Sequence, residues 1–320
     1  MVEEENKKDD LIGLKPPISF VPHLWGQIWK FKLFHSSTHS FSQDVESAIS
    51  GTYEHFDRYI TLMNLSKRLV HGLDKDYEEL IKKGYSTAIC YKELAAIVDS
   101  MFCELYSSVD CTRTVIAAVY GKYRCVPSDS TSRLFEYAAV GKLSGKKVKK
   151  LVHMDERVPI EIRKALADGH NDWFPKLKNI RDAINHSSVG DCSDLEGRRK
   201  GEFEPKISYF HRSLADKEGN TLVAEDIFKM LSDYEVKVNL FLGSVYYALN
   251  QTLKDEETTQ VCGIFNGRAY LRLVSPYEEI DFNSGRFLSR EWFEKEDQPT
   301  CPYVNICGAY VKNENVDCLN

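Results

Sequence analysis

Residues 171–188, NDWFPKLKNIRDAINHSS, are the stretch on which the fold prediction depends most. Four of its apolar residues recur at spacings of four, three and four: Trp173, Leu177, Ile180 and Ile184. That is the period of an α-helix that buries one face. Asn171 or Asp172 is expected to cap the start of this helix, and Gly190 is expected to end it.

Similar apolar stripes extend over most of the chain. They predict further helices in five places: from residue 42 to about 63, around 77–81, at 90–119, as two helices within 129–168, and at 224–253. The wide apolar face of the last of these predicts a central position. Alternating residues and a turn-forming segment predict a β-hairpin at about 203–223, and Val261–Val274 predicts two short strands around Asn266-Gly267. We therefore expect a mainly α protein.

Three parts are expected along the chain. Residues 1–40 are an N-terminal arm, interrupted by prolines and rich in aromatic residues, which either packs on the main body or binds a partner. Residues 41–257 are the helical domain with its hairpin insertion. Residues 258–320 are a small appended C-terminal unit, either α/β or irregular, with several prolines.

Composition narrows the class of protein. The chain has 320 residues, 42% hydrophobic and 28% charged, which are ordinary globular values. A formal net charge of −6 disfavours coating of nucleic acid through bulk positive charge, but not a local basic patch. Nine cysteines without a C-x-x-C pair predict reduced thiols in a cytosolic protein. The acidic N-terminus does not resemble a signal peptide, and no apolar run is long enough to span a membrane, so a cytoplasmic location is expected.

The polar side of the predicted helix 171–188 carries the candidate catalytic side chains. At about 100° per residue, four side chains span roughly 140° of its circumference: Arg181, Asn185, Asp182 and His186. Arginine offers a planar fork of donors for phosphate, and histidine exchanges a proton near neutral pH. Such a set suits phosphoryl transfer without a metal, although the same residues also occur on an ordinary solvated face.

The segment 179–186, NIRDAINH, resembles the R-x4-6-H signature of the HEPN superfamily. Asp182 occupies the polar position that often follows the arginine, and Ser187-Ser188 follow the histidine. The resemblance covers about residues 41–253 and implies an antiparallel helical bundle, with the motif late in the domain and a long helix after it. The hairpin at 203–223 would be an insertion relative to the simplest bundles.

This resemblance implies a metal-independent endoribonuclease without a cofactor. In active members, two subunits pack with their motif helices facing each other, and the paired Arg and His form one composite site in the cleft of the homodimer. His186 would then act as general acid or base, Arg181 would stabilise charge on the scissile phosphate, and Asp182 and Asn185 would position them. The products would carry 2′,3′-cyclic phosphate and 5′-hydroxyl ends. Such proteins commonly serve as toxins, in antiviral defence or in RNA processing. An antitoxin or another regulatory protein is a further candidate partner, which the sequence does not identify.

Two runs of positive charge are candidates for holding the RNA backbone, and the alternative for each is a solvated loop. These runs are Lys146, Lys147, Lys149 and Lys150, and then Arg198, Arg199 and Lys200. No metal site is predicted. His153, His170 and His211 lack partners at ligand spacing, and Cys262, Cys301, Cys307 and Cys318 fit no common zinc module. Phosphate-binding glycine loops and the G-x-S-x-G nucleophile elbow are absent.

Two other hypotheses stay open beside the nuclease. One is a catalytically silent HEPN-like module that uses the same cleft to bind RNA, a nucleotide or a partner protein. The other is a helical protein in which the motif is a coincidence. The exposure of Arg181 and His186, and the contacts that each makes, bear on this choice.

Overall fold

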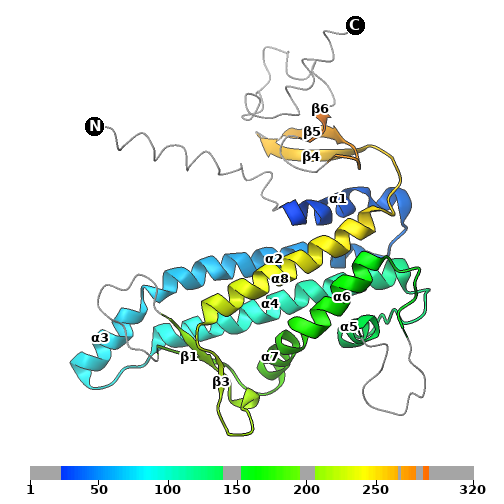
Figure 1. Ribbon diagram of the computed structural model, residues 1–320. Helices are drawn as coiled ribbons and strands as arrows, with labels where there is room; N and C mark the ends of the chain where they lie inside the picture. The colour runs from blue at the N-terminus through cyan, green and yellow to red at the C-terminus, as the bar shows by residue number, and fades with distance from the viewer. Residues whose placement is uncertain (1–22, 140–152, 195–205, 266–267, 279–283, 288–320) are drawn as a thin grey trace, which may run out of the picture. The chain divides into compact units, whose positions relative to one another are not determined.

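The computed structural model describes residues 23–139, 153–194, 206–265, 268–278 and 284–287. Within them the chain is mainly α-helical, with two small antiparallel sheets, so the predicted mainly α class is confirmed (Figure 1). The chain divides into two compact units. One comprises residues 41–245, and the other comprises residues 1–40 together with 246–320.

Helices make up most of the unit 41–245. They are α2 Gln43–Val70, α3 Leu73–Lys83, α4 Ile89–Tyr120, α5 Thr131–Ala139, α6 Ile160–Asp172, α7 Phe174–His186 and α8 Ile227–Asn250, the last of which continues past residue 245. Each lies where the apolar stripes predict a helix, with ends that differ by a few residues to a full turn or two. None of the helices in the described part of the chain is both long and apolar enough to cross a membrane.

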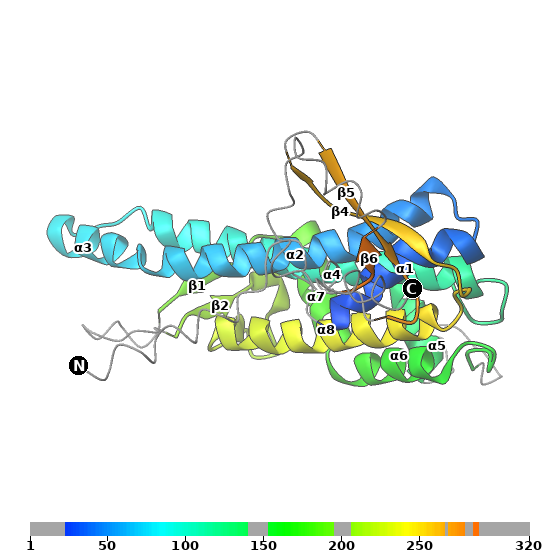
Figure 2. The ribbon, with the colours of Figure 1, turned by 90° about the horizontal axis from the view of Figure 1, so that it is seen from above.

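The two longest helices, α2 and α4, lie side by side and run antiparallel (Figures 1 and 2). Their polar cross-contacts show the direction. The Thr52 and Thr112 hydroxyls lie 3.4 Å apart near one end of the pair. Farther along, His55 Nδ1 lies 2.6 Å from Glu104 Oε2. As the residue number rises along α2, it therefore falls along α4.

Helix α8 packs against both members of this pair. The buried Tyr59 hydroxyl of α2 donates a hydrogen bond of 2.8 Å to the backbone oxygen of Leu231. Phe102 of α4 meets Tyr234 edge to face, with ring centroids 6.1 Å apart. Large rings that are completely enclosed in this way contribute heavily to a core. The predicted central position of the helix at 224–253 agrees with these contacts.

The start of α7 differs from the prediction. Asn171 and Asp172 are the last residues of α6 and do not cap α7, which begins at Phe174 after a break at Trp173. Pro175 accounts for the break, because proline lacks an N–H and has a fixed φ, which suits the first turn of a helix. The helix also ends at His186, so Ser187 and Ser188 lie beyond it.

A three-stranded antiparallel sheet follows α7. It consists of β1 Asp191–Ser193, β2 Ser208–Phe210 and β3 Leu222–Ala224, in the order β1-β2-β3. The pairing of β2 with β3 confirms the predicted hairpin, while β1 was not predicted. A short 3-10 helix and a turn join β2 to β3. In this turn the Asp216 carboxylate accepts the backbone N–H groups of Glu218 and Asn220, and Gly219 supplies the positive φ of 82°.

The other unit combines both ends of the chain. It contains α1 His23–Thr38, β4 Thr258–Phe265, β5 Arg268–Val274 and β6 Arg286–Phe287, and the strands form an antiparallel sheet in that order. The pairing of Phe265 with Arg268 confirms the predicted two short strands, although Asn266-Gly267 lie outside the described residues. Phe34 of α1 packs with Val274 of β5 in a small buried cluster. This part of the predicted arm is therefore a helix with a buried apolar side.

Candidate functional site

Helix α7 carries the predicted motif and packs antiparallel on α4. Asn185 lies opposite Cys103, and Arg181 lies opposite Tyr106, three residues farther along α4. Four residues of α7 are buried: Phe174, Leu177, Ile180 and Ala183. Trp173 is also buried, but just before the helix, and Ile184 is only partly buried, so the buried stripe is shifted from the predicted one.

Arg181 is held on two sides. The carbon at the centre of its guanidinium lies 4.5 Å from the centroid of the Tyr106 ring, a cation–π arrangement that contributes about 1 kcal/mol. Its Nη1 donates to Asp182 Oδ1 over 2.9 Å. Lys178, one turn earlier, donates to the other oxygen of the same carboxylate over 2.5 Å. One carboxylate thus bridges two cations on a single helix face.

The charges around Asp182 set its protonation state. Partial burial raises the pKa of its carboxyl, but the hydrogen bonds and charges of Lys178 and Arg181 outweigh that effect and bring the pKa below its ordinary value. Asp182 is therefore ionised at neutral pH. The side chains of Lys178, Arg181 and Asp182 are 34%, 32% and 33% exposed, so solvent and solutes reach all three.

His186 and Asn185 close the helix on its exposed side. Among the described residues, the His186 side chain has no hydrogen-bond partner, and it is exposed. Asn185 Oδ1 accepts a weak hydrogen bond of 3.7 Å from the Cys103 thiol. Five residues at about 100° each place Arg181 and His186 roughly 140° apart around the helix. Arg181 thus lies at the edge of the α4 interface, while His186 extends from the helix end into solvent.

A polar stripe on α4 supports the motif and was missed in the sequence. Its members are Asp99, Cys103, Tyr106 and Asp110, at spacings of four, three and four. This is the same helical period that identified the apolar stripes, but the residues are polar. Cys103 and Tyr106 contact α7 directly. A search for helical spacing among polar as well as apolar residues would have found these positions.

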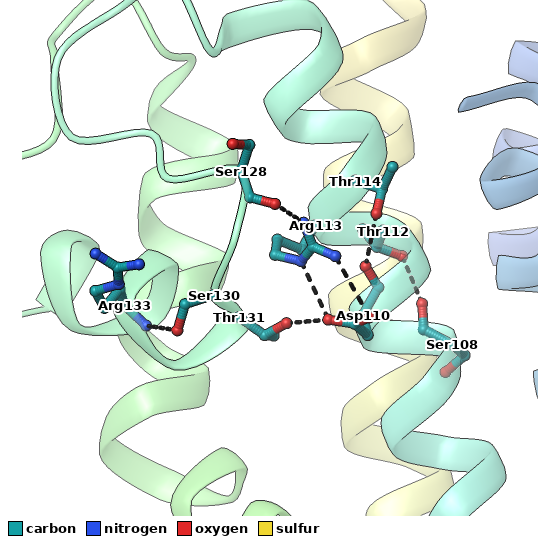
Figure 3. A network of polar contacts seen from close by, with 9 residues as sticks. All are labelled: Ser108, Asp110, Thr112, Arg113, Thr114, Ser128, Ser130, Thr131 and Arg133. Carbon is teal, nitrogen blue, oxygen red and sulfur yellow. Dashed lines mark hydrogen bonds and ion pairs between the residues drawn. The ribbon is translucent and has the colours of Figure 1, made fainter. Parts of the chain in front are cut away.

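Asp110 links this stripe to α5 through a network of polar contacts (Figure 3). Its carboxylate accepts hydrogen bonds from Arg113, one turn ahead on α4, and from the Thr131 hydroxyl at the start of α5. Arg113 in turn donates to the backbone oxygen of Ser128. Burial raises the pKa of Asp110, but these hydrogen bonds and the charges of Arg113 and Arg181 prevail and lower it. The carboxylate beside Tyr106 is therefore ionised and already paired.

The chain that leaves α7 is anchored by a buried polar cluster. Asp99 is 7% exposed and accepts the Tyr209 hydroxyl and the Gly190 N–H, the latter over 3.0 Å. His211 Nε2 lies 2.9 Å from the backbone oxygen of Ser188. Burial raises the pKa of Asp99, and the two hydrogen bonds and the nearby His211 offset only part of that rise. The residues that follow His186 are thus fixed from α4 and β2.

The remaining predicted site residues do not join this site. The basic runs Lys146–Lys150 and Arg198–Lys200 fall outside the described residues. So do three of the four cysteines weighed as zinc ligands, while Cys262 is half-buried in β4. His211 belongs to the buried cluster, His153 is exposed and His170 lies on α6. Among the described residues, no three His, Cys, Asp or Glu side chains gather as they would around a metal ion.

Comparison with known proteins identified no relative. No protein-family model, no curated protein and no solved structure matches this chain.

Proposed function

We propose that this chain is a metal-independent endoribonuclease of the HEPN type, which acts as a homodimer through Arg181 and His186. One observation carries the proposal. A single helix presents a guanidinium that is fixed from behind by an aromatic ring, and an imidazole that is exposed and free of any hydrogen-bond partner in the described residues. The first group suits a phosphate, and the second can move a proton.

The reaction would proceed by attack of the ribose 2′-hydroxyl on the adjacent phosphorus. The bond from the 2′-oxygen to phosphorus forms as the bond from phosphorus to the 5′-oxygen breaks. His186 takes the 2′-hydroxyl proton as a base or gives a proton to the departing 5′-oxygen as an acid, and water exchanges the other proton. Arg181 stabilises the charge on the non-bridging oxygens. The products carry a 2′,3′-cyclic phosphate and a 5′-hydroxyl.

A second copy of the chain would bring together an Arg181 and a His186 that point in different directions on one helix. Arg181 and His186 of one helix point roughly 140° apart, which favours their action on different sides of α7. Two motif helices that face each other across a twofold axis would bring the Arg of one subunit toward the His of the other. Two copies also double the number of groups available for phosphoryl transfer. The expected composite site therefore belongs to the dimer.

The test is an RNA-cleavage assay in EDTA with Arg181→Ala and His186→Ala. Matched controls are Arg68→Ala, an exposed arginine in the last turn of α2, and His153→Ala, an exposed histidine outside the helices. We expect cleavage with cyclic-phosphate ends by the wild type and by both controls, and none by the two motif variants. Cleavage that persists without His186 would refute its role.

A silent binding module is the second candidate, and one observation favours it. Asp182 already accepts both Arg181 and Lys178, so the charge of the motif arginine is compensated within the chain. In that case the folded wild type would bind RNA or a partner without cutting RNA. Intact substrate after incubation with a confirmed dimer would move the assignment to this candidate.

A further inference from the structure

We infer that Lys178 and Arg181 form a two-cation clamp for an RNA phosphodiester, and that Asp182 occupies this clamp as an internal anion until RNA displaces it. The inference rests on the proposed function for the identity of its ligand. It adds Lys178 to the binding groups and gives Asp182 a competing role in place of a supporting one.

The geometry of the three side chains is that of a bridged anion. The two oxygens of Asp182 are divided between the two cations, with 2.9 Å to Arg181 Nη1 and 2.5 Å to Lys178 Nζ. The two non-bridging oxygens of a phosphodiester can be divided in the same way. All three side chains are about one third exposed, so both cations lie where a strand in solution can approach them.

Tyr106 makes the clamp directional. Its ring covers one face of the Arg181 guanidinium at 4.5 Å, and the donors of a guanidinium lie along its edge. Stacking therefore fixes the plane of the group and leaves its edge available to an anion. The other carboxylate nearby, Asp110, takes Arg113 and Thr131 as partners. Asp182 is thus the anion directly hydrogen-bonded to Arg181 among the described residues.

The internal anion is readily displaced. Ion pairs at this exposure stabilise a protein weakly, because water screens them and the side chains lose freedom when they pair. A competing phosphate therefore loses little affinity to Asp182. Removal of the Asp182 charge should tighten RNA binding up to about fivefold, which corresponds to about 1 kcal/mol.

The experiment measures binding of a fluorescently labelled oligouridine in EDTA, by anisotropy over a range of salt concentrations. Every protein carries His186→Ala so that the RNA stays intact. The variants are Asp182→Asn, Lys178→Gln and Arg181→Gln. Lys176→Gln is the control for lysine, because Lys176 is exposed on the same helix but roughly 160° around the helix axis from Lys178. Asp168→Asn, an exposed carboxylate on α6, is the control for net charge.

We expect Asp182→Asn to bind more tightly than Asp168→Asn, and this gain to vanish when Lys178→Gln and Arg181→Gln are both present. Lys178→Gln and Arg181→Gln should each weaken binding and reduce the salt slope by about 0.7, the value for one lost contact to a single strand. Lys176→Gln should change neither. Equal effects of Lys178→Gln and Lys176→Gln, or no gain from Asp182→Asn over its control, would overturn the clamp.

The clamp and the nuclease can fail separately. Binding that follows the expected pattern, with no cleavage by the chain that retains His186, would leave the clamp standing and reject the nuclease. Cleavage that depends on Arg181 and His186, together with RNA binding that is unchanged by Lys178→Gln and Asp182→Asn, would support the nuclease and reject the clamp.

Discussion

Gly190 shows how closely the chain is held after the motif. A Cβ atom on this residue would lie 2.2 Å from the ring of Tyr209, which is completely buried and donates to Asp99. Tyr209 cannot yield without the loss of that hydrogen bond. The absence of a side chain at position 190 is therefore a requirement of packing.

Gly190→Ala should lower the free energy of unfolding by about 2 kcal/mol or more, as expected when extra volume is forced into a filled site. Urea unfolding followed by circular dichroism measures the change. Val189→Ala is the neighbouring control, because Val189 is 79% exposed and should stay within about 0.5 kcal/mol of wild type. Similar losses for both variants would argue against the clash with Tyr209.

Asp99 should make stability depend on pH in an unusual direction for a carboxylate. Burial raises its folded-state pKa above the unfolded value, so the native state binds the extra proton between the two values. Its contribution is present below the unfolded pKa, about 4, and is lost as pH rises through the folded value. Relative to Asp99→Asn, the wild type should therefore lose stability with rising pH in that window.

Unfolding of both proteins across this pH range provides the measurement. The difference between them isolates Asp99, because the other carboxyl groups with shifted pKa values are common to both proteins. A difference that stays constant, or that grows in favour of the wild type as pH rises, would contradict the raised pKa.

Only part of the candidate site could be predicted residue by residue. Arg181 and His186 follow from a spacing within one segment. Lys178 lies in the same segment, but its role depends on its ion pair with Asp182. The sequence does not show which cation pairs with that carboxylate. Tyr106 and Cys103 lie more than 70 residues away from the motif and are recognisable only once α4 is known to pack against α7.

At the scale of elements, a column of rings connects the motif to the core. Arg181 covers Tyr106, Tyr106 stacks with Phe174 at 6.1 Å, and Phe174 stacks with Phe135 at 3.8 Å. These groups come from α7, α4 and α5, so the column joins three helices. The orientation of Arg181 is thus tied to the packing of its own helix at the other end.

Tyr106→Leu should remove both the ring stack and the cation–π contact, and should lower stability by about 1–3 kcal/mol. Tyr106→Phe keeps the ring and should lose less. A double-mutant cycle with Arg181→Gln measures the coupling between the two side chains in unfolding experiments, where we expect about 0.5–1 kcal/mol. Additive effects of the two substitutions would show that the stack does not hold Arg181.

Element positions were more predictable than element ends. Apolar spacing locates α2, α4 and α8 because each buries one long stripe. The same spacing misplaced the start of α7, since Pro175 has a stronger effect on the first turn than the capping preference of Asn171 or Asp172. The three-residue strand β1 carries too few residues for an alternating pattern, and its pairing with β2 decides its structure.

At the scale of the whole molecule, the proposed composite site of a homodimer predicts how mixtures of two variant chains behave. Arg181→Ala and His186→Ala chains should each be inactive alone. When they are mixed under conditions that allow subunits to exchange, heterodimers should recover cleavage, because each retains one intact Arg and one intact His. The same RNA assay measures this recovery, with sedimentation to confirm exchange. No recovery in proven heterodimers would argue against a site shared between subunits.

The contact between the N-terminal helix α1 and the end of α8 could not be predicted from the spacing of neighbouring residues. Asn250 donates to the backbone oxygen and the side chain of Gln27, over 2.9 and 2.8 Å. These residues are more than 200 positions apart, and neither apolar periodicity nor turn signals contain information on that distance. The helical class, by contrast, depends on local stripes and was predicted correctly.

The hydrogen bond from Tyr59 to Leu231 has a consequence for folding during translation. As the chain emerges from the ribosome, α2 and α4 can pair early, because few residues separate them. The backbone oxygen that the Tyr59 hydroxyl needs belongs to Leu231, which is synthesised about 170 residues after Tyr59 and therefore well after α4 is complete. During that interval the apolar side later covered by α8 faces solvent or a chaperone, so elongation rate and chaperone supply should govern the yield of this protein.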